Sequence, residues 1–142
     1  MKTLLSKQPI VGVGVMVLKD GKVLLGKRKG SHAPSEYAGP GGHLEYMESP
    51  IDCATREVEE ETGIRIKNVR FLMLHNLTKY EPKHIVLINF IADWESGEPH
   101  VRELDRHEGW DWYDLDKLPA PLYETVSECV EAYKTGQTYW ES

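Results

Sequence analysis

The sequence predicts one domain over residues 1–142 with an α/β (α+β) fold, an α/β/α sandwich whose mixed, partly antiparallel sheet lies between two helices. Apolar, β-prone runs at 11–17, 66–76 and 84–94 predict strands. Capping residues delimit one helix at 50–62, and apolar residues at helical spacing predict another at 121–135. A chain of 142 residues suits one domain of this kind.

A hairpin is the first predicted element. Valines at 11, 13, 15 and 17 alternate with glycine and methionine, which is the period of a strand buried on one face. Asp20-Gly21 is a tight-turn pair, so residues 22–29 are predicted to return as the partner strand. Gly12 and Gly14 indicate that a helix or a ligand approaches the other face closely.

Glycine, proline and polar residues separate the later elements. Residues 30–39 form a predicted loop, and Pro40-Gly41-Gly42 turns the chain into a short strand that ends at Glu45. The run at 84–94 is apolar on both faces, so we expect this strand at the centre of the sheet. A charged loop at 95–107 precedes a strand at 110–113. The C-terminal helix has its apolar residues on one side: Leu122, Val126, Cys129, Val130 and Tyr133.

The helix at 50–62 has signals at both ends. Ser49 and Pro50 form an N-cap and N1 pair, and Asp52 completes a capping box in which aspartate replaces the usual glutamate. Gly63 supplies the left-handed residue that ends the helix. The buried stripe is predicted to consist of Ile51, Ala54 and Val58, with carboxylates beside it.

Three of those carboxylates, Glu57, Glu60 and Glu61, are i, i+3 and i+4 neighbours on one sector of the helix. A solvated acidic face, with Arg56 pairing Glu60, is the simple explanation of such a run. The capped helix and the preceding glycine pair favour a metal site instead. Clustered carboxylates bind Mg²⁺, which takes a few of them together with waters and phosphate oxygens. Glu59 lies on the opposite side and is expected to face solvent and to be dispensable.

Composition excludes several classes of function. A net charge of −6 argues against binding of a nucleic-acid polymer as the main activity. Cys53 and Cys129 have no metal-site or disulfide spacing, so we expect reduced thiols. No run reaches the length of a membrane span, and residues 1–19 lack a signal-peptide pattern. We therefore expect a soluble, cytoplasmic protein without a membrane partner; a homodimer is one option for its assembly.

Residues 42–64 match the pattern G-x5-E-x7-R-E-U-x-E-E-x-G-U, where U is aliphatic, at all nine defined positions. This pattern is the Nudix box, and the sequence resembles Nudix hydrolases of the MutT type. Shorter matches at 12–15, 24–30 and 37–45 resemble a nucleoside-triphosphate diphosphatase subgroup, and the similarity covers most of residues 10–118. Met47 and Gly39 depart from common family residues, which affects the expected loop shape rather than the metal site.

The resemblance implies roles for the box residues and for the residue before the box. Glu57, Glu60 and Glu61 would bind Mg²⁺, or Mn²⁺ as a substitute, together with the carbonyl of Gly41. Arg56 would orient a carboxylate. Glu57 is the first choice for activating the attacking water, although family members differ over which glutamate is the base.

Other site residues are predicted with simpler alternatives. Arg28 would reach substrate phosphates, or it is a solvated strand end. Tyr37 would stack on a base, or it belongs to the core. His43 would contact the nucleotide, or it lies on the surface. The resemblance also implies an extra acidic metal ligand just before the strand at 110–113, where Glu108 is the match by position and Glu103 and Asp105 compete with it.

The function implied by these matches is Mg²⁺-dependent hydrolysis of a nucleoside or deoxynucleoside triphosphate to the monophosphate and pyrophosphate. ADP-ribose or dinucleoside polyphosphate hydrolysis is the alternative within the family. The marker positions downstream of the box hold Tyr80 and Pro82, which fit neither of these two activities. A catalytically silent binding module is a third option, but such modules usually lack box glutamates, and all are present here.

Overall fold

A computed structural model describes residues 7–30 and 34–142. Their sheet has eight strands with the order β3-β2-β1-β6-β5-β8, while β4 pairs with β1 and β7 pairs with β2. The elements in chain order are β1 (Ile10–Lys19), β2 (Lys22–Arg28), β3 (Tyr37–Ala38), β4 (Gly41–His43), α2 (Pro50–Thr62), β5 (Arg65–Leu77), β6 (Ile85–Ser96), β7 (His107–Asp114), α3 (Glu124–Thr135) and β8 (Tyr139–Glu141).

The sheet is mixed, as predicted. β1 runs parallel to β6, and β5 runs parallel to β8, whereas the other strand pairs are antiparallel. β6 lies between β1 and β5, which confirms its central position. The turn between β1 and β2 has a positive φ at both Asp20 (51°) and Gly21 (78°), the conformation of a tight hairpin turn.

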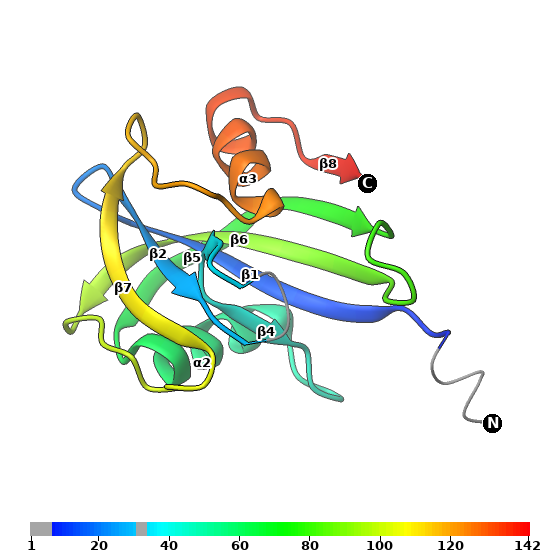
Figure 1. Cartoon of the computed structure of the whole chain (residues 1–142), viewed down its shortest axis with the longest axis horizontal. Coiled ribbons are helices and arrows are strands. Elements are labelled where there is room, and N and C mark those ends of the chain that lie inside the picture. Colours follow the sequence, from blue (N-terminus) through cyan, green and yellow to red (C-terminus); the bar gives the residue numbers. More distant parts are fainter. Residues whose placement is uncertain (1–6, 31–33) are drawn as a thin grey trace.

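The two helices lie on opposite faces of the sheet (Figure 1). One apolar cluster lies beneath α2 and contains Cys53, Ala54 and Val58 together with valines of β1. A second cluster lies beneath α3 and contains Val126 and Cys129. The predicted α/β/α sandwich is therefore confirmed. No helix among residues 7–30 and 34–142 is long and apolar enough to cross a membrane.

α2 begins and ends where the caps predict. The Ser49 hydroxyl accepts a hydrogen bond from the Asp52 N–H at 3.0 Å, and Gly63 adopts φ = 80° at the C-terminal end. The predicted buried stripe was partly wrong, because Ile51 is 49% exposed whereas Glu61 is 4% exposed. At about 100° per residue, Glu61 lies near the middle of the buried arc, and Ile51 lies at its edge in the first turn.

Several other predicted boundaries differ from the structure. The short strand ends at His43, two residues before Glu45, and α3 begins at Glu124 rather than at 121. Tyr133 of α3 is 47% exposed, so it is not part of the buried side of that helix. The charged loop is shorter than expected because β6 continues to Ser96 and β7 begins at His107. The short strands β3 and β8 were not predicted.

Candidate active site

A cavity of about 820 Å³ opens beside the acidic face of α2. Its wall combines residues from β1, β2 and β4, the loop before β7 and the first turns of α3. The cavity therefore extends from the box carboxylates to the helix on the other side of the sheet.

Arg56 connects most of the acidic side chains on this face. Its Nε and Nη2 donate to the two carboxylate oxygens of Glu48 at 2.7 and 3.0 Å, and its Nη1 donates to Glu57 at 2.8 Å and Glu60 at 3.2 Å. The bidentate pair lowers the pKa of Glu48 to about 2 and raises the pKa of the Arg56 guanidinium. Arg56 thus fixes the carboxylate of Glu57 relative to the helix.

Glu57 faces the backbone of β4 at very close range. A Cβ built on Gly42 would overlap the Glu57 carboxylate, so only glycine leaves room for that side chain in its present position. The Glu57 side chain is 13% exposed. Burial raises the pKa of Glu57, and Arg56 opposes this shift. The glycine pair before the helix therefore has a packing role at the site.

Glu61 is the most deeply buried of the three carboxylates. One of its oxygens accepts a hydrogen bond from the Gly41 N–H at 2.7 Å. Burial raises the pKa of Glu61 to about 8, against the opposing effect of the Gly41 N–H, and the nearby Glu57 raises it further. An anionic Glu61 is therefore costly in this environment without a neighbouring cation.

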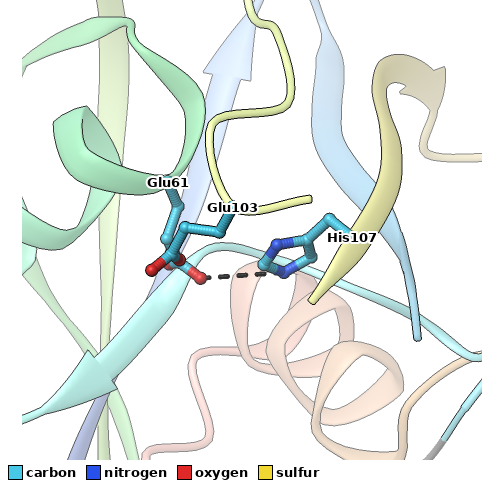
Figure 2. Close-up of side chains that lie close together, drawn as sticks. All are labelled: Glu61, Glu103 and His107. Carbon is cyan, nitrogen blue, oxygen red and sulfur yellow. Dashed lines mark ion pairs between the residues drawn. The ribbon is translucent and has the colours of Figure 1, made fainter. Parts of the chain in front are cut away.

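A histidine and a further carboxylate, His107 and Glu103, lie close to Glu61 (Figure 2). His107, the first residue of β7, places its Nε2 3.7 Å from Glu61 Oε1, and a Glu103 oxygen lies within 4.8 Å of both ligand atoms. The His107 ring packs on Trp110 with a centroid separation of 4.6 Å. Burial and the neighbouring Arg28 and Arg106 lower the pKa of His107 to about 4, so its imidazole is neutral near pH 7.

The remaining predicted residues lie in different environments. Arg28 and His43 line the cavity, with the Arg28 guanidinium 5.5 Å from the centre of the Tyr123 ring. Glu60 does not line the cavity, and its side chain is 56% exposed. Tyr37 does not line the cavity; it packs in the core beneath α3, edge-on to Tyr113 with ring centroids 5.9 Å apart. Tyr37 therefore lies in the core, which was the alternative to stacking on a base.

Glu108 lies outside the cluster that contains Glu61. Its side chain is 48% exposed, and its carboxylate lies 4.0 Å from the ammonium group of Lys27. Lys27 pairs with Gly109 but Arg28 pairs with His107, so Glu108 is the additional residue of a β-bulge. The bulge directs His107 inward, and the competing residue Glu103 is the acidic side chain that reaches Glu61.

His107 and Asn89 were not predicted from the sequence as residues of the site. Asn89 is 3% exposed and lines the cavity beside Gly14, where an added Cβ would lie 2.5 Å from the Asn89 side-chain oxygen. A polar residue inside the predicted central strand was the available signal for Asn89. For His107, the available signal was a titratable residue at the end of the predicted charged loop, close to the predicted strand at 110–113.

Fold and site together define a hydrolase of the Nudix type, which confirms the predicted enzyme class. The chain belongs to the NUDIX domain family, whose sequence model matches residues 8–133. Its sequence is 34% identical over 117 residues to the ADP-ribose pyrophosphatase of Methanocaldococcus jannaschii, a match that covers 82% of this chain and 68% of that protein.

Two further similarities agree with this family. It is 30% identical over 112 residues to the NAD-capped RNA hydrolase NudC of Chromobacterium violaceum, which covers 78% of this chain but spans only 41% of the NudC length. The crystal structure of a MutT NUDIX hydrolase from Burkholderia pseudomallei superimposes with a TM-score of 0.83 at 36% identity and covers 88% of this chain and 98% of that one. The two named relatives act on different substrates, ADP-ribose and NAD-capped RNA.

Proposed function

We propose that this protein is a divalent-metal-dependent pyrophosphohydrolase that converts nucleoside or deoxynucleoside triphosphates to monophosphates and pyrophosphate. The observation that carries the proposal is the position of Glu57 and Glu61, which line a cavity of about 820 Å³. That volume is within the range typical of small-molecule sites. The metal-binding and phosphate-binding groups are therefore adjacent to space for the rest of a nucleotide.

The carboxylates fit a divalent cation by their chemistry. Glu57 and Glu61 are largely buried, and burial raises the pKa of each, so their anionic forms lack sufficient compensation from the protein alone. Glu57, Glu60 and Glu61, with the Gly41 carbonyl, are the proposed ligands. A bound Mg²⁺ would supply charge neutralisation on phosphate oxygens and acidify a water molecule. Hard carboxylate oxygens are the ligands that Mg²⁺ prefers.

The protein residues would perform three separate tasks. Glu57 accepts the proton of the attacking water, and the hydrogen bond from Arg56 holds its carboxylate in one orientation. Arg28, on the cavity wall, contacts phosphate oxygens. The cavity surface around Gly12, Gly14 and Asn89 accommodates the base, with His43 at its entrance. Tyr37 is not included because its side chain packs in the core.

Hydrolysis of ADP-ribose is the second candidate. It is favoured by the 34% identity to a protein named ADP-ribose pyrophosphatase. Both activities cleave a phosphoanhydride bond and would use the same carboxylates, so the metal site does not distinguish them. The distinction depends on what occupies the cavity beyond the two phosphates.

A substrate panel tests the proposal. We expect ATP, GTP, CTP, UTP and their deoxy forms to be hydrolysed with Mg²⁺ at higher kcat/KM than ADP-ribose or diadenosine polyphosphates. If ADP-ribose is hydrolysed at least tenfold faster than every triphosphate, a difference of about 1.4 kcal/mol in activation free energy, the triphosphate proposal is wrong and the second candidate replaces it. No hydrolysis of any phosphoanhydride would exclude both.

A further inference from the structure

The cluster of Glu61, Glu103 and His107 contains polar atoms without partners. His107 Nδ1 and Glu103 Oε1 are buried, and neither has a hydrogen-bond partner among residues 7–30 and 34–142. The second ring nitrogen, Nε2, faces Glu61 Oε1 at 3.7 Å, which is beyond hydrogen-bond distance. More than about 90% of buried polar groups in native proteins are paired, so the unpaired atoms of His107 and Glu103 stand out, whereas Glu61 has the Gly41 N–H as a partner.

The backbone fixes these side chains together. The N–H groups of Arg106 and His107 both donate to the Glu103 carbonyl, at 3.0 and 3.2 Å, so the segment turns back on itself and brings Glu103 close to His107. The Arg106 carbonyl accepts from the Lys29 N–H at 2.8 Å, which ties the turn to the end of β2. The arrangement in Figure 2 is therefore built from a tethered turn and the buried helix α2.

The chemistry of the three groups indicates what the missing partner is. The cluster consists of two acidic side chains and one imidazole, and their oxygen and nitrogen atoms are the ligand types that bind metal cations. Metal–nitrogen and metal–oxygen bonds of about 2.1 Å allow two ligand atoms to lie up to about 4.2 Å apart, so the 3.7 Å between His107 and Glu61 fits a shared ion. Imidazole nitrogen is a good ligand for first-row transition ions, whereas Mg²⁺ prefers oxygen.

We propose that His107 is a nitrogen ligand in a metal subsite with Glu61 and Glu103, and that it shifts the preference of this subsite from Mg²⁺ toward transition ions. The inference rests on the proposed function, because Glu61 also belongs to the proposed Mg²⁺ site. It adds a ligand of a different chemical type and a metal selectivity that the box residues do not provide. If His107 only supports Glu61 by packing, its nitrogen makes no bond to the ion.

The test uses Mn²⁺ as a paramagnetic probe, bound to the tag-free protein without substrate. Electron spin-echo envelope modulation is expected to show nitrogen coupling in the wild type, and the coupling is expected to disappear in His107→Asn. His84→Asn is the matched control, since His84 does not line the cavity and bonds Asn76 at 2.7 Å. If His107→Asn does not fold, His107→Gln replaces it. A wild-type spectrum without nitrogen coupling would by itself reject His107 as a metal ligand.

Competition binding gives the second readout. His107→Asn should weaken Co²⁺ binding by about tenfold or more, while Mg²⁺ binding changes by less than about threefold. Mn²⁺ that binds without nitrogen coupling, or equal losses for Co²⁺ and Mg²⁺, would overturn the role of His107 and leave the proposed hydrolase intact. Failure of the wild type to bind Mn²⁺ at all would reject both this subsite and the metal requirement of the proposed function.

Discussion

Replacing Gly42 with alanine tests whether the position of the Glu57 carboxylate sets the rate. The new Cβ would lie 2.5 Å from both carboxylate oxygens of Glu57, whereas ordinary van der Waals contacts begin at about 3.5 Å. Glu57 must therefore move by roughly 1 Å, and a displacement of that size in a catalytic group costs about 100-fold in rate, equivalent to about 2.7 kcal/mol. We expect kcat to fall about 100-fold in Gly42→Ala.

The assay is steady-state hydrolysis with saturating Mg²⁺, accompanied by thermal unfolding of the same samples. Gly109→Ala is the matched control, because a Cβ at Gly109 has no heavy atom within 4 Å. Its kcat should stay within about threefold of the wild type. A Gly42→Ala enzyme that keeps a wild-type kcat would refute the reasoning, since Glu57 would then tolerate displacement. A much lower Tm in Gly42→Ala would instead show that the loss of activity comes from reduced stability of the fold.

Three further predictions concern the box helix and the loop that precedes it. Glu57→Gln and Glu61→Gln should each lower kcat by roughly 10²–10⁴-fold, while Glu59→Gln should keep a kcat near that of the wild type because Glu59 is exposed. Equal losses of kcat in all three variants would contradict the assigned helix faces. Met47 has φ = 66°, a left-handed backbone conformation that is strained in methionine and relaxed in glycine. Met47→Gly should therefore raise the free energy of unfolding by up to about 1 kcal/mol in denaturant titrations. A lower free energy of unfolding in this variant would contradict the strain at residue 47. The ion pair with Arg56 lowers the pKa of Glu48 from 4.5 to about 2, so its stabilising effect is present above pH 4.5 and is lost as the pH falls through 2. The Tm difference between the wild type and Glu48→Gln should therefore narrow between pH 4.5 and pH 2. A difference that stays constant over this interval would contradict the stabilising role of the ion pair.

Local signals predicted most of the fold correctly. The limits of α2 depend on Ser49, Pro50 and Gly63, whose backbone preferences act within a few residues of the helix ends. The hairpin at Asp20-Gly21 is equally local. Strands β3 and β8 are different, because two or three residues carry little periodicity, and β8 pairs with β5, which is distant in the sequence.

The relative positions of candidate site residues were predictable within one helix, and they were less predictable where two separate segments meet. Glu57, Glu60 and Glu61 have fixed relative positions because the helix period relates them. The choice among Glu103, Asp105 and Glu108 depended on the register of β7 against β2, and the bulge opposite Arg28 shifts that register by one residue. A one-residue shift reverses which side chains face inward, and no local pattern encodes it here.

The most direct test of the account is the identity of the products formed from one nucleoside triphosphate, followed by ³¹P NMR in Mg²⁺ and again in excess chelator. The account predicts nucleoside monophosphate and pyrophosphate in equal amounts with Mg²⁺, and no turnover with the chelator. Nucleoside diphosphate with orthophosphate would contradict the proposed cleavage between the α and β phosphates, and undiminished turnover in excess chelator would contradict the role of the Glu57, Glu60 and Glu61 carboxylates as metal ligands.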